Sequence, residues 1–168
     1  DRSAPVVHEW ISGPPPPTRI AAAGAIGRLD VVSAAKQAGL EEITYITRKA
    51  PELWKGSPAE DMLDLETVTD PVLFFDENAA KGASIFEEKL NVTATLALAG
   101  IGFERTRVNL WADHDYPHST HIIELKAMTG TMRIELANTV APVNEKSSWL
   151  TAASIARAVK NRSFVLKV

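Results

Sequence analysis

Thr106-Arg-Val-Asn-Leu-Trp111 alternates polar and apolar residues, and the same period of two returns in Thr120–Leu125 and Thr131–Ala137. Side chains two residues apart share one face of a β-strand, so each stretch predicts a strand with one face toward a core. Gly130 stands just before the third stretch and suits a tight turn. We therefore expect an antiparallel meander of three strands over residues 106–137.

The rest of the chain predicts further elements. Strands are expected at residues 19–23, 42–47, 71–75 and 164–168, and helices at residues 29–38, 78–86, 91–99 and 147–160, with a loop and about one helical turn over residues 49–70. The apolar strand 71–75 is expected to be buried on both faces. The fold class is α+β, an α/β sandwich in which a mixed, largely antiparallel sheet of about six strands has helices packed on one face. Residues 1–17 end in four prolines and are expected to be an arm or linker, and residues 18–168 form the domain.

Composition narrows the class of function. The 168 residues are 45% hydrophobic and 23% charged, typical of a soluble globular domain. A net charge of −3 and scattered Lys and Arg argue against nucleic acid as a partner. No apolar stretch reaches the roughly 18 residues that span a bilayer, and the first residues do not look like a signal peptide, so we expect no membrane and a cytoplasmic location. The lack of cysteine excludes disulfides, thiolate nucleophiles and Cys-based zinc sites.

Two kinds of site are not expected. Gly24-Ala-Ile-Gly27 and Gly100-Ile-Gly102 each lack part of the G-x-G-x-x-G fingerprint, so a self-contained dinucleotide-binding domain is absent from these residues. Three of the four histidines lie between residues 114 and 121, but their spacing matches no helical pair of metal ligands. His114 and His118 flank a proline turn and are expected to face solvent.

His121 differs from its neighbours because it lies inside a predicted strand. Ile123 and Leu125 follow it at even spacing, so its ring should share their face. A buried core histidine is the simplest interpretation. The functional alternative is that the imidazole lines a pocket. Asn91, at the start of the helix expected at residues 91–99, could reach the same pocket.

A second candidate lies before the last predicted helix. Ser147 or Ser148 can cap that helix, and its free amides together with Lys146 could attract a carboxylate. The segment is therefore either a plain helix cap with a solvated lysine or an anion site for a dicarboxylic acid.

These segments together resemble the C-terminal domain of the L-aspartate dehydrogenase family. Gly24–Asp30 resembles its G-A-I-G-x-L-D signature, Asn91–Ala99 is similar to its N-V-A-A-T-L-A-L-A helix, and Asn144–Thr151 is similar to N-P-K-T-S-x-L-T. Residues 38–60 resemble the strand and loop in between, and the match runs from about residue 20 to the end. Ser119 stands where the family usually has Asn, and Glu88 and Glu145 replace usual prolines.

The resemblance implies NAD(P)-dependent oxidative deamination of L-aspartate to iminosuccinate, which water converts to oxaloacetate and ammonia. His121 would be the acid/base, and an imidazole with an ordinary pKa of about 6.5 suits that transfer. Asn91 and Ala25 would contact the nicotinamide of NAD or NADP, and Lys146, Ser147 and Ser148 would bind a substrate carboxylate. The resemblance also implies a homodimer that acts in NAD biosynthesis.

The family's N-terminal Rossmann half has no counterpart in these residues, so the isolated chain is expected to be inactive. Other interpretations stay open. One is a related oxidoreductase that resembles dihydrodipicolinate reductase. The other is a non-catalytic or dimerisation domain that lacks its cofactor half and associates through an apolar outer sheet face, which Val108 and Leu110 could provide.

Overall fold

The computed structural model describes residues 29–86, 91–137, 140–141 and 144–148, together with Ala153 and Ala156. The expected arm, the strands expected at residues 19–23 and 164–168, and the glycine turn at residues 24–27 lie outside the described residues.

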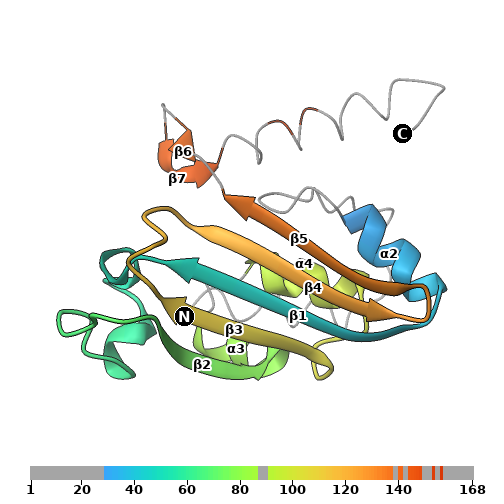
Figure 1. The fold of residues 1–168 in the computed structure, drawn as a ribbon, viewed down its shortest axis with the longest axis horizontal. Coiled ribbons are helices and arrows are strands. Elements are labelled where there is room, and N and C mark those ends of the chain that lie inside the picture. The colour runs from blue at the N-terminus through green and yellow to red at the C-terminus, as the bar shows by residue number, and fades with distance from the viewer. Residues whose placement is uncertain are drawn as a thin grey trace.

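A five-stranded sheet forms the centre of the described part of the chain (Figure 1). Across the sheet the order is β2 (Val72–Asn78), β3 (Thr106–Ala112), β1 (Leu40–Lys49), β4 (Thr120–Ala127) and β5 (Gly130–Ala137). β1 and β3 run parallel, and the other neighbouring pairs are antiparallel. The expected α+β class with a mixed, largely antiparallel sheet is thus confirmed, with five strands in this sheet instead of about six.

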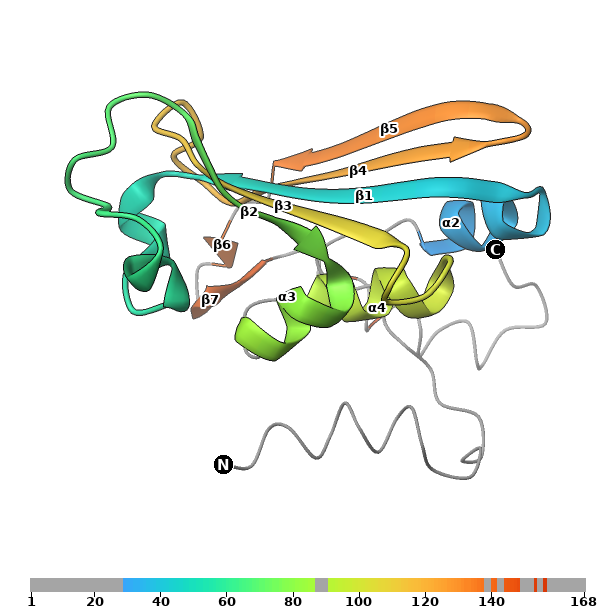
Figure 2. The same ribbon diagram turned by 90° about the horizontal axis from the view of Figure 1, so that it is seen from below.

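Three helices lie on the same face of this sheet, as Figure 2 shows. They are α2 (Leu29–Gln37), α3 (Ala79–Ile85) and α4 (Asn91–Ala99). Gly39, with φ of +80°, follows the end of α2, and the side chain of Asn78 caps α3 by accepting a hydrogen bond from the Lys81 amide. The 49–70 segment holds two short 3₁₀ helices, η1 (Pro51–Trp54) and η2 (Pro58–Asp61), where one helical turn was expected.

The expected meander is wrong in one connection. β4 and β5 do form a hairpin, with Gly130 at φ of +124°, but β3 pairs with β1 and β2 and not with β4. β1 lies between them, so that Ile43 stands opposite Thr106 on one side and Leu125 on the other. Alternation reports which face of a strand is buried, but it carries no information on which strand lies beside it.

Two expectations about burial are also corrected. β2 is an edge strand and is not buried on both faces, since Leu73 is 38% exposed. Val108 and Leu110 are both fully buried in the core, so they cannot supply an apolar outer face. The alternation correctly predicts that Val108 and Leu110 share one face of β3 and that Arg107 and Asn109 share the other. The face with Val108 and Leu110 is the one that the helices cover.

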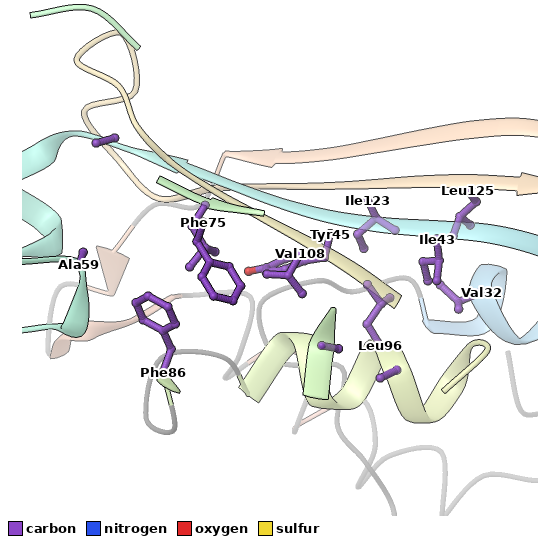
Figure 3. Packing of buried hydrophobic residues seen from close by; sticks show 14 of the residues in the cluster. Val32, Ile43, Tyr45, Ala59, Phe75, Phe86, Leu96, Val108, Ile123 and Leu125 are labelled. Carbon is purple, nitrogen blue, oxygen red and sulfur yellow. The ribbon is translucent and has the colours of Figure 1, made fainter. Parts of the chain in front are cut away.

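The core fills the space between the sheet and the helices (Figure 3). Val32 of α2 and Leu96 of α4 point toward Ile43 and Val108 of the sheet. Burying such side chains contributes about 1.5–3 kcal/mol each. The apolar core holds β1 and β4 against the helices, and it thereby determines where the polar side chains of these two strands lie.

The helix expected from Ser147 does not begin there. Asn144–Ser148 forms strand β7, which pairs with β6 (Val140–Ala141) in a separate two-stranded sheet. The backbone N–H and C=O groups of this segment pair with β6, so they are not the free amides of a helix start. Ala153 and Ala156 are helical, and the remainder of the expected helix lies outside the described residues. In the part of the chain that is described, no helix has the length and apolar character needed to cross a membrane.

Candidate functional site

His121 is the second residue of β4 and stands opposite Thr47 of β1. Because neighbouring residues of a strand point to opposite faces, His121 shares the helix-covered face with Ile123 and Leu125, as the alternation predicts. Ile123 is fully buried, whereas His121 is half-buried at the end of the strand. The ring therefore lies where the apolar core gives way to a polar cluster.

Two hydroxyl groups of β1 bind the imidazole from the neighbouring strand. The Tyr45 Oη lies 2.7 Å from Nδ1 of His121, and the Thr47 Oγ1 lies 3.3 Å from the same nitrogen. Thr47 also donates a hydrogen bond of 2.7 Å to the Tyr45 Oη. The Tyr45 and His121 rings are nearly parallel, with centroids 5.9 Å apart. Figure 3 shows Tyr45 on the same side of the sheet as Val108.

The sequence analysis did not select Tyr45 and Thr47, although their positions in a predicted strand indicate that they share one face. Residues 42–47 were expected to be a strand, and alternation from Ile43 places Tyr45 and Thr47 on one face. Two polar residues in succession on a buried face need partners, and the strand pairing supplies His121. The pairing itself could not be read from the chain.

Burial and a nearby cation keep the imidazole neutral. Burial, and after it the positive charge of Lys49, together lower the pKa of His121 from 6.5 to about 4. Lys49 is itself 8% exposed, and its Nζ lies 3.6 Å from the centroid of the Trp54 ring, a cation–π contact. Burial also raises the pKa of Tyr45, so its hydroxyl keeps its proton. The expected ordinary pKa of His121 is therefore corrected downward.

Mild acid is expected to destabilise the fold through His121. Its pKa is lower in the folded chain, about 4, than its ordinary value of 6.5, so the unfolded chain binds a proton more readily between these values. The contribution to the free energy of unfolding is complete above pH 6.5 and falls by about 1.5 kcal/mol on going to about pH 5. Urea unfolding of the wild type and of His121→Gln at both pH values measures the difference. An equal loss in the two proteins would contradict the assignment.

Asn91 is the first residue of α4, as expected, and its side chain lies outside the described part. Ala25 is also outside it. Thr93, in the first turn of α4, is fully buried, and its Oγ1 has no hydrogen-bond partner in the part of the chain that is described.

The other expected residues are only partly placed. Lys146, Ser147 and Ser148 lie in β7, so they do not form a helix start, and their side chains lie outside the described part. His114 and His118 are exposed, as expected. Within the described ranges no group of three or more His, Asp or Glu side chains is arranged to hold a metal ion.

The loop before β4 is anchored by a buried carboxylate. Asp113 is 1% exposed and forms a 3.2 Å salt bridge with Arg48 of β1. Its Oδ1 accepts a hydrogen bond from the Asp115 amide, and its own amide donates to the Lys49 carbonyl. These contacts tie the turn that leads into Thr120 and His121 to the end of β1. A neutral imidazole bound at Nδ1 by the two hydroxyls leaves Nε2 for proton exchange.

Comparison with known proteins shows which family the chain resembles. The sequence model of the family described as aspartate dehydrogenase, C-terminal, matches residues 30–162. The L-aspartate dehydrogenase of Acinetobacter baumannii is 43% identical over 139 residues, which are 83% of this chain and 53% of that protein. The L-aspartate dehydrogenase of Ralstonia pickettii is 37% identical over 145 residues, 86% of this chain and 54% of that protein.

A solved structure is also similar. The crystal structure of aspartate dehydrogenase from Thermotoga maritima matches with a TM-score of 0.66 and 25% identity, over 87% of this chain and 54% of that one. The chain thus spans about half the length of the relatives that it matches. Its sequence and its fold agree, and the chain belongs to the aspartate dehydrogenase family, whose C-terminal domain it contains.

Proposed function

We propose that the intact protein oxidises L-aspartate with NAD or NADP and releases iminosuccinate, which hydrolyses to oxaloacetate and ammonia. The observation that carries the proposal is the hydrogen-bonded, neutral His121 at the polar end of the core, in a chain of this family. A nicotinamide ring, when bound, supplies the acceptor for the hydride that leaves the substrate Cα.

His121 acts as the acid/base at the substrate nitrogen. The amine must be neutral before its lone pair can assist loss of hydride, so a group that accepts a proton is needed beside it. The Nδ1 of His121 is held by Tyr45 and Thr47, which leaves Nε2 for this exchange. The same nitrogen can activate the water that attacks the imine carbon.

Asn91 and the backbone of Ala25 are proposed to hold the nicotinamide carboxamide. Support comes from the position of Asn91 in the first turn of α4. This is a positioning role, which sets the distance between the hydride donor and acceptor. The glycine-rich loop for the pyrophosphate is proposed to lie in the Rossmann half of the protein, outside residues 18–168.

Lys146, with Ser147 and Ser148, is proposed to bind a substrate carboxylate. A charge-assisted contact of this kind contributes about 1.5–3 kcal/mol. Lys146→Ala is therefore expected to raise the KM for L-aspartate by roughly 10-fold or more, with little change in kcat or in cofactor affinity. Steady-state kinetics measures KM and kcat of this variant and of the control Lys36→Ala, which removes an exposed lysine of α2. A KM equal to that of the Lys36 variant would remove Lys146 from the site.

The activity itself is tested on the intact enzyme. Purified protein with L-aspartate is expected to reduce NAD or NADP, as followed by nicotinamide absorbance, and the two cofactors tested in parallel decide the preference. D-Aspartate and L-glutamate are the matched substrate controls. The proposal fails if neither cofactor is reduced with L-aspartate, or if L-glutamate is the better substrate.

The cellular setting is also a proposal. An enzyme that releases iminosuccinate suits a cytoplasmic role in NAD biosynthesis, and we propose that it acts there as a homodimer. None of the described helices lies on the second face of the sheet (Figure 2). Light scattering of the intact enzyme tests the dimer, and a mass of one subunit would exclude it.

A further inference from the structure

The two hydroxyls beside His121 form a chain that ends at its ring. The Thr47 Oγ1 lies 2.7 Å from the Tyr45 Oη, which in turn lies 2.7 Å from Nδ1 of His121. A hydroxyl can both donate and accept, so the Tyr45 hydroxyl can bind Nδ1 whether or not that nitrogen carries the ring proton. Among the described residues Nε2 makes no hydrogen bond.

We propose that Tyr45 and Thr47 are positioning residues for His121, whose hydroxyls hold Nδ1, fix the orientation of the ring and leave Nε2 for the substrate. The proposal deepens the proposed function and rests on it. Both residues act through His121 and are not themselves proposed to contact the substrate.

A hydroxyl partner differs from a carboxylate in what it permits. A carboxylate behind a histidine can only accept a hydrogen bond, so it stabilises the tautomer with the proton on Nδ1 and favours the imidazolium. The Tyr45 hydroxyl can accept from Nδ1 when that nitrogen carries the ring proton, or donate to it when it does not. With the ring proton on Nδ1, Nε2 can accept the proton of the substrate ammonium group, which leaves a neutral amine and an imidazolium, and release of that proton to water restores the neutral ring.

The charges around the ring agree with this. The charged group that acts on His121 is Lys49, a cation, which disfavours the imidazolium. Tyr45 is buried with its pKa raised, so it remains a neutral hydroxyl and does not become a counter-ion. The Tyr45 and Thr47 side chains reach His121 from the adjacent strand, where the register places Thr47 directly opposite it. This position is fixed by backbone pairing and needs no ligand.

The first test is kinetic and uses the intact enzyme. Tyr45→Phe keeps the ring and removes the hydroxyl, and it is expected to lower kcat about 10- to 100-fold with little change in KM, as loss of a group that orients a histidine does elsewhere. Thr47→Val is expected to lower kcat less, the double variant to lower it most, and Thr47→Ser to restore it. Tyr116→Phe is the matched control, because it removes the chain's other tyrosine hydroxyl. A double variant with the kcat of the wild type would overturn the proposal.

The second test needs no turnover. ¹⁵N NMR of histidine-labelled protein at neutral pH is expected to show a neutral His121 whose Nδ1 resonance moves in the double variant Tyr45→Phe with Thr47→Val, while the resonances of the exposed His118 stay in place. An Nδ1 resonance of His121 that is unchanged in the double variant would refute the inference. If the intact enzyme does not oxidise L-aspartate, the proposed function fails, and the NMR result still decides the role of the hydroxyls.

Discussion

His121→Ala in the intact enzyme is expected to lower turnover with L-aspartate by about 100-fold or more, as loss of a general acid/base typically does. The imidazole is the titratable group at the centre of the described cluster, and neither Tyr45 nor Thr47 can replace a base whose proton transfer occurs at neutral pH. The measurement is kcat and KM under saturating cofactor, at a temperature well below the melting point of the variant. The loss should appear in kcat.

His118→Ala is the matched control for this experiment. His118 lies three residues earlier in the chain and is exposed, so its removal should leave kcat within about twofold of the wild type. Turnover of the His121 variant near that of the His118 variant would exclude His121 from the chemistry. It would then favour the simpler interpretation, in which the imidazole satisfies the hydroxyls of Tyr45 and Thr47.

Leu96→Ala is expected to lower the free energy of unfolding by about 2–5 kcal/mol. Leu96 is fully buried on the face of α4 that packs against the sheet, and Figure 3 shows it pointing toward the strands. Shortening it removes buried apolar surface and leaves a cavity between helix and sheet. A loss of this size is a large fraction of the stability of a typical domain. Urea unfolding followed by tryptophan fluorescence measures it.

Leu98→Ala tests whether burial is the cause. Leu98 belongs to the same helix and is 49% exposed, so the same substitution should cost less than about 1 kcal/mol. Both variants change helix propensity equally, and their difference reports packing alone. Equal losses at the two positions would show that α4 does not dock on the sheet as described.

The chain's local patterns were sufficient for several parts of this fold. Helix α4 has the predicted bounds, Asn91–Ala99, and the β4–β5 hairpin and the face of His121 follow from the period of two. Each of these depends on residues within a few positions of one another, where propensity and spacing act directly. The helix expected at Ser147 shows the limit, because pairing with β6 made that segment a strand.

The candidate site needed both kinds of information. Sequence alone selected His121, Asn91, Ala25, Lys146, Ser147 and Ser148, and of these the structure describes the side chain of His121. Residue type and spacing can mark a histidine within a strand, but they cannot report what its ring contacts.

Only the tertiary structure decided what surrounds His121. Tyr45 lies 76 residues earlier in the chain, yet its hydroxyl is 2.7 Å from Nδ1, because β1 is inserted between β3 and β4. That insertion also brings Lys49 and the core to the ring and lowers its pKa. The amino-acid sequence by itself determined which residues form strands and which face each presents. Which strands become neighbours depends on the packing of the whole sheet against its helices, and hydrogen bonds and burial across that long sequence separation arise only once the sheet is assembled.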